Sequence, residues 1–154
     1  MAEQGDAPQP ARTPSTSPIM AVDVGTVRIG LAKSDPSGRI ALPIATIAAK
    51  PREAALQTIL TYARELRPSQ VIVGLPLTLE GDEATASMRS RRFAAQLQKL
   101  IPCRVAMIDE RLTTVVAEAA LRDADVSRAK RKQVIDQAAA TILLQTFLDH
   151  RAGR

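Results

Sequence analysis

The stretch IMAVDVGTVRIGLAK, residues 19–33, predicts two strands joined by a tight turn. Its first part, Ile19–Val24, is a short apolar run that a single acid, Asp23, interrupts. Its second part, residues 27–33, alternates loosely between apolar and polar side chains, as a half-buried strand does. The Gly-Thr pair between the two parts supplies the turn.

Outward from this pair, periodicity and turn signals predict a third strand, then helices that alternate with strands. This order favours an α/β fold with a five-stranded mixed sheet and helices on its faces, formed by residues 19–150 as one domain. The expected elements are a strand at 39–47, a helix at Arg52–Leu66, a strand at 70–73, a helix at 83–100 with Phe93, Leu97, Leu100 and Ile101 inward, a strand at 104–108, a helix at 114–121, a basic loop at 122–132 and a helix at 134–148.

Residues 1–18 differ from the rest in composition. They contain four of the ten prolines, together with Ser, Thr, Gln and Ala, and no bulky apolar side chain. Such a segment buries too little surface to offset the entropy of ordering it, so we expect a disordered tail.

Composition excludes several classes of protein. One cysteine and one histidine among 154 residues rule out a disulfide framework and a Cys-rich zinc site, and they argue against Ser-His-Asp catalysis. No apolar run approaches the roughly 20 residues that cross a bilayer, so we expect no membrane segment. The net charge of +5 favours polyanionic partners, and the 2% aromatic content argues against stacking of single-stranded bases.

Three acids stand where burial is expected. Asp23 interrupts the first strand, and Glu110 follows the apolar strand at 104–108. Asp136 lies on an apolar stripe of the last helix, because Ala139, Ala140, Leu143 and Phe147 follow it at helical spacing. A buried carboxylate needs compensation, so one interpretation is three separate salt bridges, with Arg28, Arg111 and Lys132 as the partners.

The joint placement of the acids favours a second interpretation. Ligand sites of open α/β sheets gather at the carboxyl ends of strands, where Asp23 and Glu110 are expected. Carboxylates that converge repel one another unless a divalent metal lies between them, and oxygen ligands select Mg²⁺ or Mn²⁺. Two such metals, about 4 Å apart, activate a water and stabilise the leaving oxygen in phosphoryl transfer, without histidine or a covalent nucleophile.

Four segments resemble the YqgF (RuvX) family of pre-16S rRNA nucleases, also described as Holliday-junction-resolvase-like. They are AVDVGTVRIGLA at 21–32, VGLPLTLEG at 73–81, IDERLTT at 108–114 and KQVIDQAAATILL at 132–144. The resemblance implies a ribonuclease-H-like fold, and it implies that Asp23, Glu110 and Asp136 are the metal-binding acids. Thr78 and Thr113 depart from the residues common in the family, Asn and Ser respectively, which bears on substrate detail.

Several residues are candidates for substrate binding. The turn residues Gly25 and Thr26 would let a phosphate approach the backbone, or they form a plain hairpin turn. Arg89 would contact phosphate, or it belongs to a solvated helix face. Arg111 would orient Glu110 or clamp a phosphate, or it forms a surface ion pair. The basic cluster Arg128, Lys130, Arg131 and Lys132 precedes Asp136 and would hold backbone beside the cleavage point, or it forms a solubilising loop.

These observations predict a cytoplasmic, metal-dependent nuclease that acts on structured nucleic acid, either precursor rRNA or branched DNA. The family resemblance makes processing of the 5′ end of pre-16S rRNA the first expectation, by a monomer or a homodimer. A four-way-junction resolvase is the alternative within the same class, and it requires a dimer. A non-catalytic nucleic-acid-binding module and an actin-like nucleotide site around Asp23 are the alternatives outside it.

Overall fold

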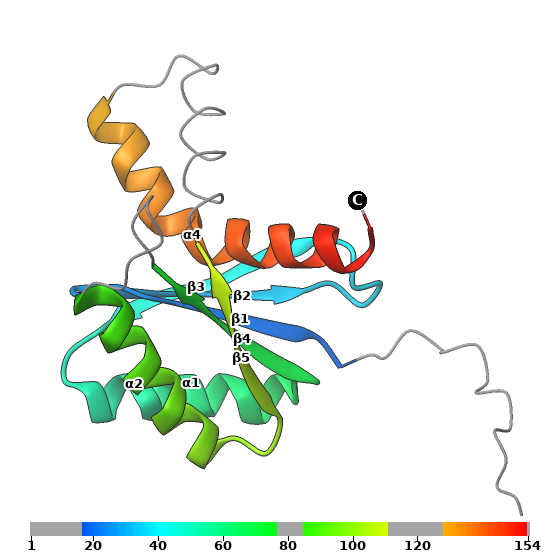
Figure 1. Cartoon of the computed structure of the whole chain (residues 1–154), viewed down its shortest axis with the longest axis horizontal. Helices are drawn as coiled ribbons and strands as arrows, with labels where there is room; N and C mark the ends of the chain where they lie inside the picture. The colour runs from blue at the N-terminus through cyan, green and yellow to red at the C-terminus, as the bar shows by residue number, and fades with distance from the viewer. Residues whose placement is uncertain (1–16, 77–84, 111–127, 154) are drawn as a thin grey trace, which may run out of the picture.

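The computed structural model describes residues 17–76, 85–110 and 128–153, and of residues 128–137 it describes the backbone alone. Three strands come first, followed by helices that alternate with strands (Figure 1). The elements are β1 (Ile19–Val24), β2 (Arg28–Ser34), β3 (Ala41–Ala48), α1 (Arg52–Leu66), β4 (Gln70–Leu75), α2 (Thr85–Leu100), β5 (Arg104–Asp109) and α4 (Arg128–Arg151).

The five strands form one mixed sheet in the order β3-β2-β1-β4-β5. Strands β1, β2 and β3 form an antiparallel meander, whereas β4 and β5 run parallel to β1. The expected five-stranded mixed sheet is therefore confirmed. Because β1, β4 and β5 are parallel, their carboxyl ends lie along one edge of the sheet.

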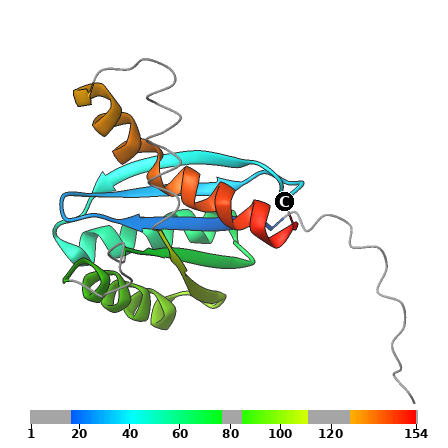
Figure 2. The ribbon, with the colours of Figure 1, turned by 45° about the horizontal axis from the view of Figure 1, so that its top comes forward.

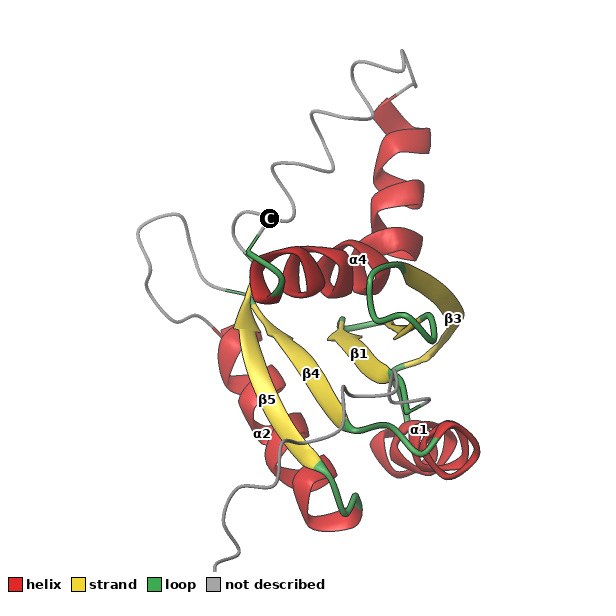
Figure 3. Ribbon diagram, turned by 90° about the vertical axis from the view of Figure 1, so that its right-hand side faces the viewer, coloured by secondary structure: helices red, strands yellow, loops and turns green. Residues whose placement is uncertain are grey.

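Helices cover both faces of the sheet (Figure 3). Helices α1 and α2 pack on one face, against Met20 and Val22 of β1 and Val71 and Val73 of β4. The C-terminal half of α4 lies across the other face (Figure 2), where it packs against Ile19 and Ala21 of β1. Successive side chains of a strand point to opposite faces, so these two sets alternate along β1.

Helix α1 follows directly from its sequence pattern. Its buried residues are spaced at helical intervals along one face, namely Ala55, Leu56, Ile59, Leu60 and Ala63. The helix ends at Leu66, and the cap residue Arg67 is in the left-handed conformation and donates its backbone N–H to the Ala63 carbonyl at 2.8 Å. Both ends of the helix agree with the prediction.

The third strand begins two residues later than predicted. The carboxylate of Asp35 accepts hydrogen bonds from the backbone N–H groups of Arg39 and Ile40, each at 3.0 Å, and so holds both residues in the turn. A second difference concerns α2, whose last residue, Leu100, is 48% exposed although the pattern placed it inward. The neighbouring Ile101 fills that part of the core instead.

The predicted tail and the predicted helix at 114–121 fall almost wholly outside the described residues. The carbonyl of Pro18 accepts a hydrogen bond from the Ser69 N–H at 2.9 Å. The residue that precedes β1 is therefore tied to the loop that precedes β4. No described helix is both long enough and apolar enough to cross a membrane.

Candidate active site

Asp23 and Glu110 come together at the carboxyl edge of the sheet. Asp23 is the penultimate residue of β1, and Glu110 immediately follows β5. The Glu110 N–H donates to the Leu75 carbonyl at 3.1 Å, which extends the pairing of β4 and β5 by one step. The parallel arrangement thus brings two acids that are far apart in sequence to one edge.

The two acids also face the same helix. Ile19 and Ala21 of β1 pack against α4, and alternation places Asp23 on that face as well. Ile108 of β5 packs on the same side, so Glu110 belongs to the same face. Both carboxyl groups therefore lie on the α4 side of the sheet.

Gly74 of β4 makes room for Glu110. A Cβ built on Gly74 would lie 2.5 Å from Cδ and 2.8 Å from Cγ of Glu110, far inside the contact distance of carbon atoms. The Glu110 side chain therefore lies directly over the bare backbone of Gly74. From the sequence alone this glycine could equally have been a simple end to the strand.

Burial raises the pKa of Glu110 to about 9. The further causes are a hydrogen bond with Asp23 and the negative charges of Asp23 and Asp109, all of which favour the protonated form. At neutral pH the Glu110 O–H therefore donates to the Asp23 carboxylate. Two acids that share one proton form a site where a divalent cation can replace that proton.

The third predicted acid, Asp136, is in α4, but its side chain lies outside the described residues. Its helix does reach the acid pair. Ala140 lies one helical turn after Asp136. Gly30 of β2 is the strand partner of Asp23. A Cβ built on Gly30 would lie 3.4 Å from the Ala140 Cβ and 3.9 Å from the Asp23 Cβ. Among the described side chains, which exclude Asp136, no group of three metal-ligating residues occurs.

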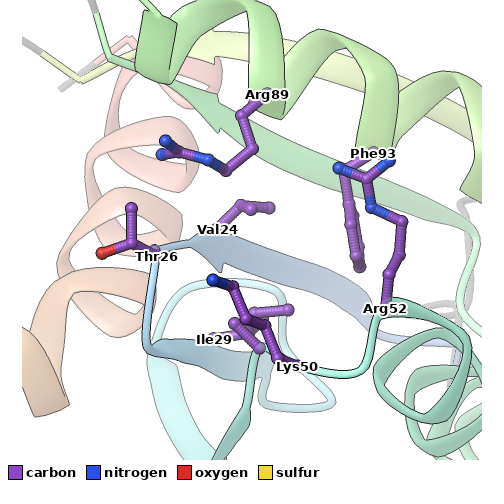
Figure 4. A pocket seen from close by; sticks show the side chains of 9 residues that line it. Val24, Thr26, Ile29, Lys50, Arg52, Arg89 and Phe93 are labelled. Atoms are coloured by element: carbon purple, nitrogen blue, oxygen red, sulfur yellow. The ribbon is translucent and has the colours of Figure 1, made fainter.

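Three of the predicted substrate-binding residues line one cavity of about 220 Å³. Gly25 and Thr26 form its wall at the end of β1, and Arg89 enters it from α2 (Figure 4). The Gly25 N–H donates to the Arg28 carbonyl at 2.9 Å, and a Cβ on Gly25 would lie 2.5 Å from that oxygen. The hairpin turn itself therefore requires glycine at this position.

The remaining predicted substrate residues are not described at the side-chain level. Arg111 lies outside the described residues. Arg128, Lys130, Arg131 and Lys132 are described by their backbone alone, in the first turns of α4. The predicted loop at 122–132 is wrong in its last five positions, because α4 begins at Arg128. Ala, Arg and Lys are good helix formers, so these residues extend the helix although they lack the apolar pattern used to predict it.

Two cations of the cavity, Lys50 and Arg52, were missed by sequence reasoning. They flank Pro51 at the start of α1. Their position at the start of a predicted helix is a signal that could have identified them. Cations at a helix N-terminus are repelled by the helix dipole, so a pair of them there favours an anion nearby.

Comparison with known proteins identifies the family. A family model described as "RuvX: Holliday junction resolvase" matches residues 17–150. This chain belongs to the RuvX family. A Chloroflexus aurantiacus protein named "Putative pre-16S rRNA nuclease" is 47% identical over 133 residues, which are 86% of this chain and 87% of that protein. A Nocardia farcinica protein of the same name is 44% identical, over 98% of this chain and 88% of that protein.

Solved structures of other nucleases share the fold of this RuvX-family chain. RuvC of T. thermophilus, in complex with a Holliday junction substrate, aligns with a TM-score of 0.57 and 15% identity over 88% of this chain and 96% of that chain. The yeast mitochondrial Holliday junction resolvase Ydc2 aligns with a TM-score of 0.56 and 9% identity, over 89% of this chain and 80% of that chain. The expectations of a ribonuclease-H-like fold and of the YqgF (RuvX) nuclease family are both confirmed.

Proposed function

We propose that this RuvX-family chain is a metal-dependent nuclease whose catalytic acids are Asp23, Glu110 and Asp136. The observation that carries the proposal is the hydrogen-bonded pair formed by the Asp23 and Glu110 carboxyl groups, with the Glu110 side chain lying directly over Gly74. Two half-buried acids in contact are costly to folding unless the pair has a use. Holding a divalent cation for phosphodiester hydrolysis is the use that fits the family.

The donor set fits magnesium or manganese. Carboxylate oxygens are hard ligands that suit both ions, and the described part of the site offers neither histidine nor thiolate. When bound, the metal supplies an activated water and neutralises the charge that develops on the phosphate. Asp23 and Glu110 would hold the ion from the sheet. Asp136 would approach from α4, since it stands one helical turn, about 6 Å along the axis, before Ala140.

Basic residues would hold the nucleic-acid backbone beside these acids. Gly25, Thr26 and Arg89 line the cavity at the end of β1. Arg111 follows Glu110 in sequence, and Arg128, Lys130, Arg131 and Lys132 precede Asp136. Each is a phosphate-contact candidate, and the net charge of +5 supports an electrostatic contribution to binding.

The relatives' names favour pre-16S rRNA as the substrate. We propose that the chain processes its 5′ end in the cytoplasm, as the family resemblance predicts. Branched DNA is the alternative, favoured by the family description and by the likeness to RuvC. Resolution of a junction requires a homodimer, because two strands must be cut symmetrically. Trimming an rRNA precursor requires only a monomer.

The test offers both substrates to the purified protein, with and without Mn²⁺ or Mg²⁺. We expect cleavage that depends on the metal, and Asp23→Asn should lower its rate by more than about a hundredfold without unfolding the protein. The matched control is Glu65→Gln, an exposed acid near the end of α1, which should leave the rate unchanged. Cleavage by Asp23→Asn at the wild-type rate would refute the assignment, and tight binding with no product under any divalent metal would favour the non-catalytic module.

A further inference from the structure

The cavity at the end of β1 combines positive charge with an apolar floor. Among the described residues that line it, Lys50, Arg52 and Arg89 are cations and none is an acid. Its apolar surface comes from Val24, Ile29, Ala49 and Phe93. Three cations around one cavity repel one another, and an anion between them removes that repulsion.

Three separate segments build the cavity, and hydrogen bonds connect two of them. The Gly25 N–H closes the β1–β2 turn onto Arg28, and the Ala49 N–H donates to the Val27 carbonyl at 2.9 Å. The second bond ties the loop that carries Lys50 to the turn that carries Thr26. The third segment is α2, which brings Arg89. Lys50 is therefore carried by a loop that is hydrogen-bonded to the turn, and Arg52 and Arg89 are carried by helices.

Two of the three cationic side chains, Lys50 and Arg89, reach toward the same side of the cavity, whereas the Arg52 head group lies beside Phe93 (Figure 4). Figure 4 shows Arg89 extending from α2 and Lys50 extending from the loop after β3, with both head groups on the side of Thr26. Lys50 and Thr26 are exposed and Arg89 is half-buried, so the charged groups are accessible to a ligand from solvent. The start of α1, next to Arg52, adds the positive end of a helix dipole.

The cavity is close to the acid pair but does not share its face. Val24 lies next to Asp23 in β1, about 3.3 Å further along the strand. Val24 packs with the α1 and α2 layer, whereas Asp23 belongs to the α4 side. A nucleic acid that reaches both places therefore has to pass over the carboxyl edge of the sheet.

The size and lining indicate which part of a nucleic acid fits. A volume of about 220 Å³ corresponds to about seven water molecules, which is enough for a phosphate group and part of a sugar. Phe93, the aromatic residue of the lining, is 2% exposed and so offers no face for base stacking. The cavity therefore suits the backbone and not the bases.

We propose that the cavity formed by Thr26, Lys50, Arg52 and Arg89 binds a backbone phosphate of the nucleic acid, across the sheet edge from the catalytic acids. The inference rests on the proposed function only in taking nucleic acid as the ligand. It adds Lys50 and Arg52 to the binding surface and defines a second point of attachment. Because the contact is to phosphate, its contribution is independent of base sequence.

The experiment measures binding without cleavage. Lys50→Gln, Arg52→Gln and Arg89→Gln are combined in an Asp23→Asn background, and fluorescence anisotropy follows labelled RNA and DNA strands of two unrelated sequences over a range of salt concentrations. The matched control combines Arg64→Gln, Lys99→Gln and Arg104→Gln in the same background. These exposed cations lie at the far ends of α1 and α2 and at the start of β5, so the control loses the same charge.

The cavity variant should bind about tenfold more weakly than the control, equally for both sequences. The slope of log affinity against log salt should fall by about 0.7–0.9 relative to the control, as expected for one lost phosphate contact. The single variants Lys50→Gln and Arg52→Gln change exposed side chains and should each weaken binding while the melting temperature stays constant.

Equal affinities for the cavity variant and the control would overturn the proposal. The proposal would also be overturned if the protein bound ATP more tightly than nucleic acid and the cavity variant lost that ATP binding. The cavity would then be assigned to a free nucleotide. The proposed nuclease function is read separately, from metal-dependent cleavage by proteins that retain Asp23. A protein that never cleaves, but whose binding depends on the cavity, would refute the function and leave this inference standing.

Discussion

Replacing Gly74 by alanine should disable the acid pair while the fold survives. The added methyl would lie 2.5 Å from Cδ and 2.8 Å from Cγ of Glu110. Carbon atoms pack at about 3.5–4.0 Å, so the Glu110 carboxyl has to retreat by about 1 Å or more. Glu110 is a flexible side chain at the end of a strand, so it can move without displacing the backbone of β4.

The expected loss of activity follows from that displacement. A misplacement of about 1 Å in a catalytic group costs about a hundredfold in rate, and Mg²⁺ tolerates little departure from its oxygen distances of about 2.0–2.1 Å. Stability should change by less than about 1 kcal/mol. The loss of glycine from a strand interior is slightly favourable, and it offsets the cost of moving one side chain.

The assay is the initial rate of nucleic-acid cleavage over a titration of Mn²⁺, together with calorimetric measurement of metal binding. Gly30→Ala is the matched control, because it adds the same methyl to the neighbouring strand. There the new Cβ would lie 3.4 Å from the Ala140 Cβ and 3.9 Å from the Asp23 Cβ, so neither has to move far. We expect the control to retain activity within a few-fold.

A double mutant isolates the mechanism. If the methyl at position 74 acts only through Glu110, adding Gly74→Ala to Glu110→Gln should cause little further loss of activity. Wild-type activity of the single variant would refute the reasoning. The reasoning would also be refuted if Gly74→Ala lowered activity as much in the Glu110→Gln background as in the wild type, because Gly74 would then act through something other than Glu110.

The remaining predictions concern stability. The pKa of Glu110 is raised from 4.5 to about 9, so without metal the folded protein holds a proton that the unfolded chain releases, and stability is lost as pH rises through this range. In EDTA and below pH 4.5, Glu110→Gln should have the melting temperature of the wild type. Between pH 4.5 and pH 9 its melting temperature should exceed that of the wild type by a growing margin. Parallel plots of melting temperature against pH for the two proteins would contradict the raised pKa. Gln145→Ala removes the acceptor of the Ala41 N–H at 2.9 Å and the donor to the Arg39 carbonyl at 2.9 Å, two bonds that join α4 to the start of β3 and to the turn before it. Urea denaturation should show a loss of about 1–3 kcal/mol, and no loss would mean that these bonds are replaced by water.

The sequence predicted most of the secondary structure because the signals were local. The first strand and α1 have the predicted limits, since a short apolar run and a one-sided helical pattern depend only on near neighbours. The late start of β3 was missed because it depends on the Asp35 side chain capturing backbone N–H groups of the turn. The early start of α4 was missed because polar helix formers carry no apolar period.

The sequence by itself determined that acids interrupt apolar segments, and it therefore marked Asp23 and Glu110 as unusual. Only the tertiary structure decided that these two meet, that Gly74 makes the space for Glu110, and that Lys50 and Arg52 join Arg89 around one cavity. Hydrophobic periodicity is a property of residues close together along the chain. Convergence of side chains depends on parallel strand pairing and on which face each strand presents, and these arise from contacts between segments distant in sequence.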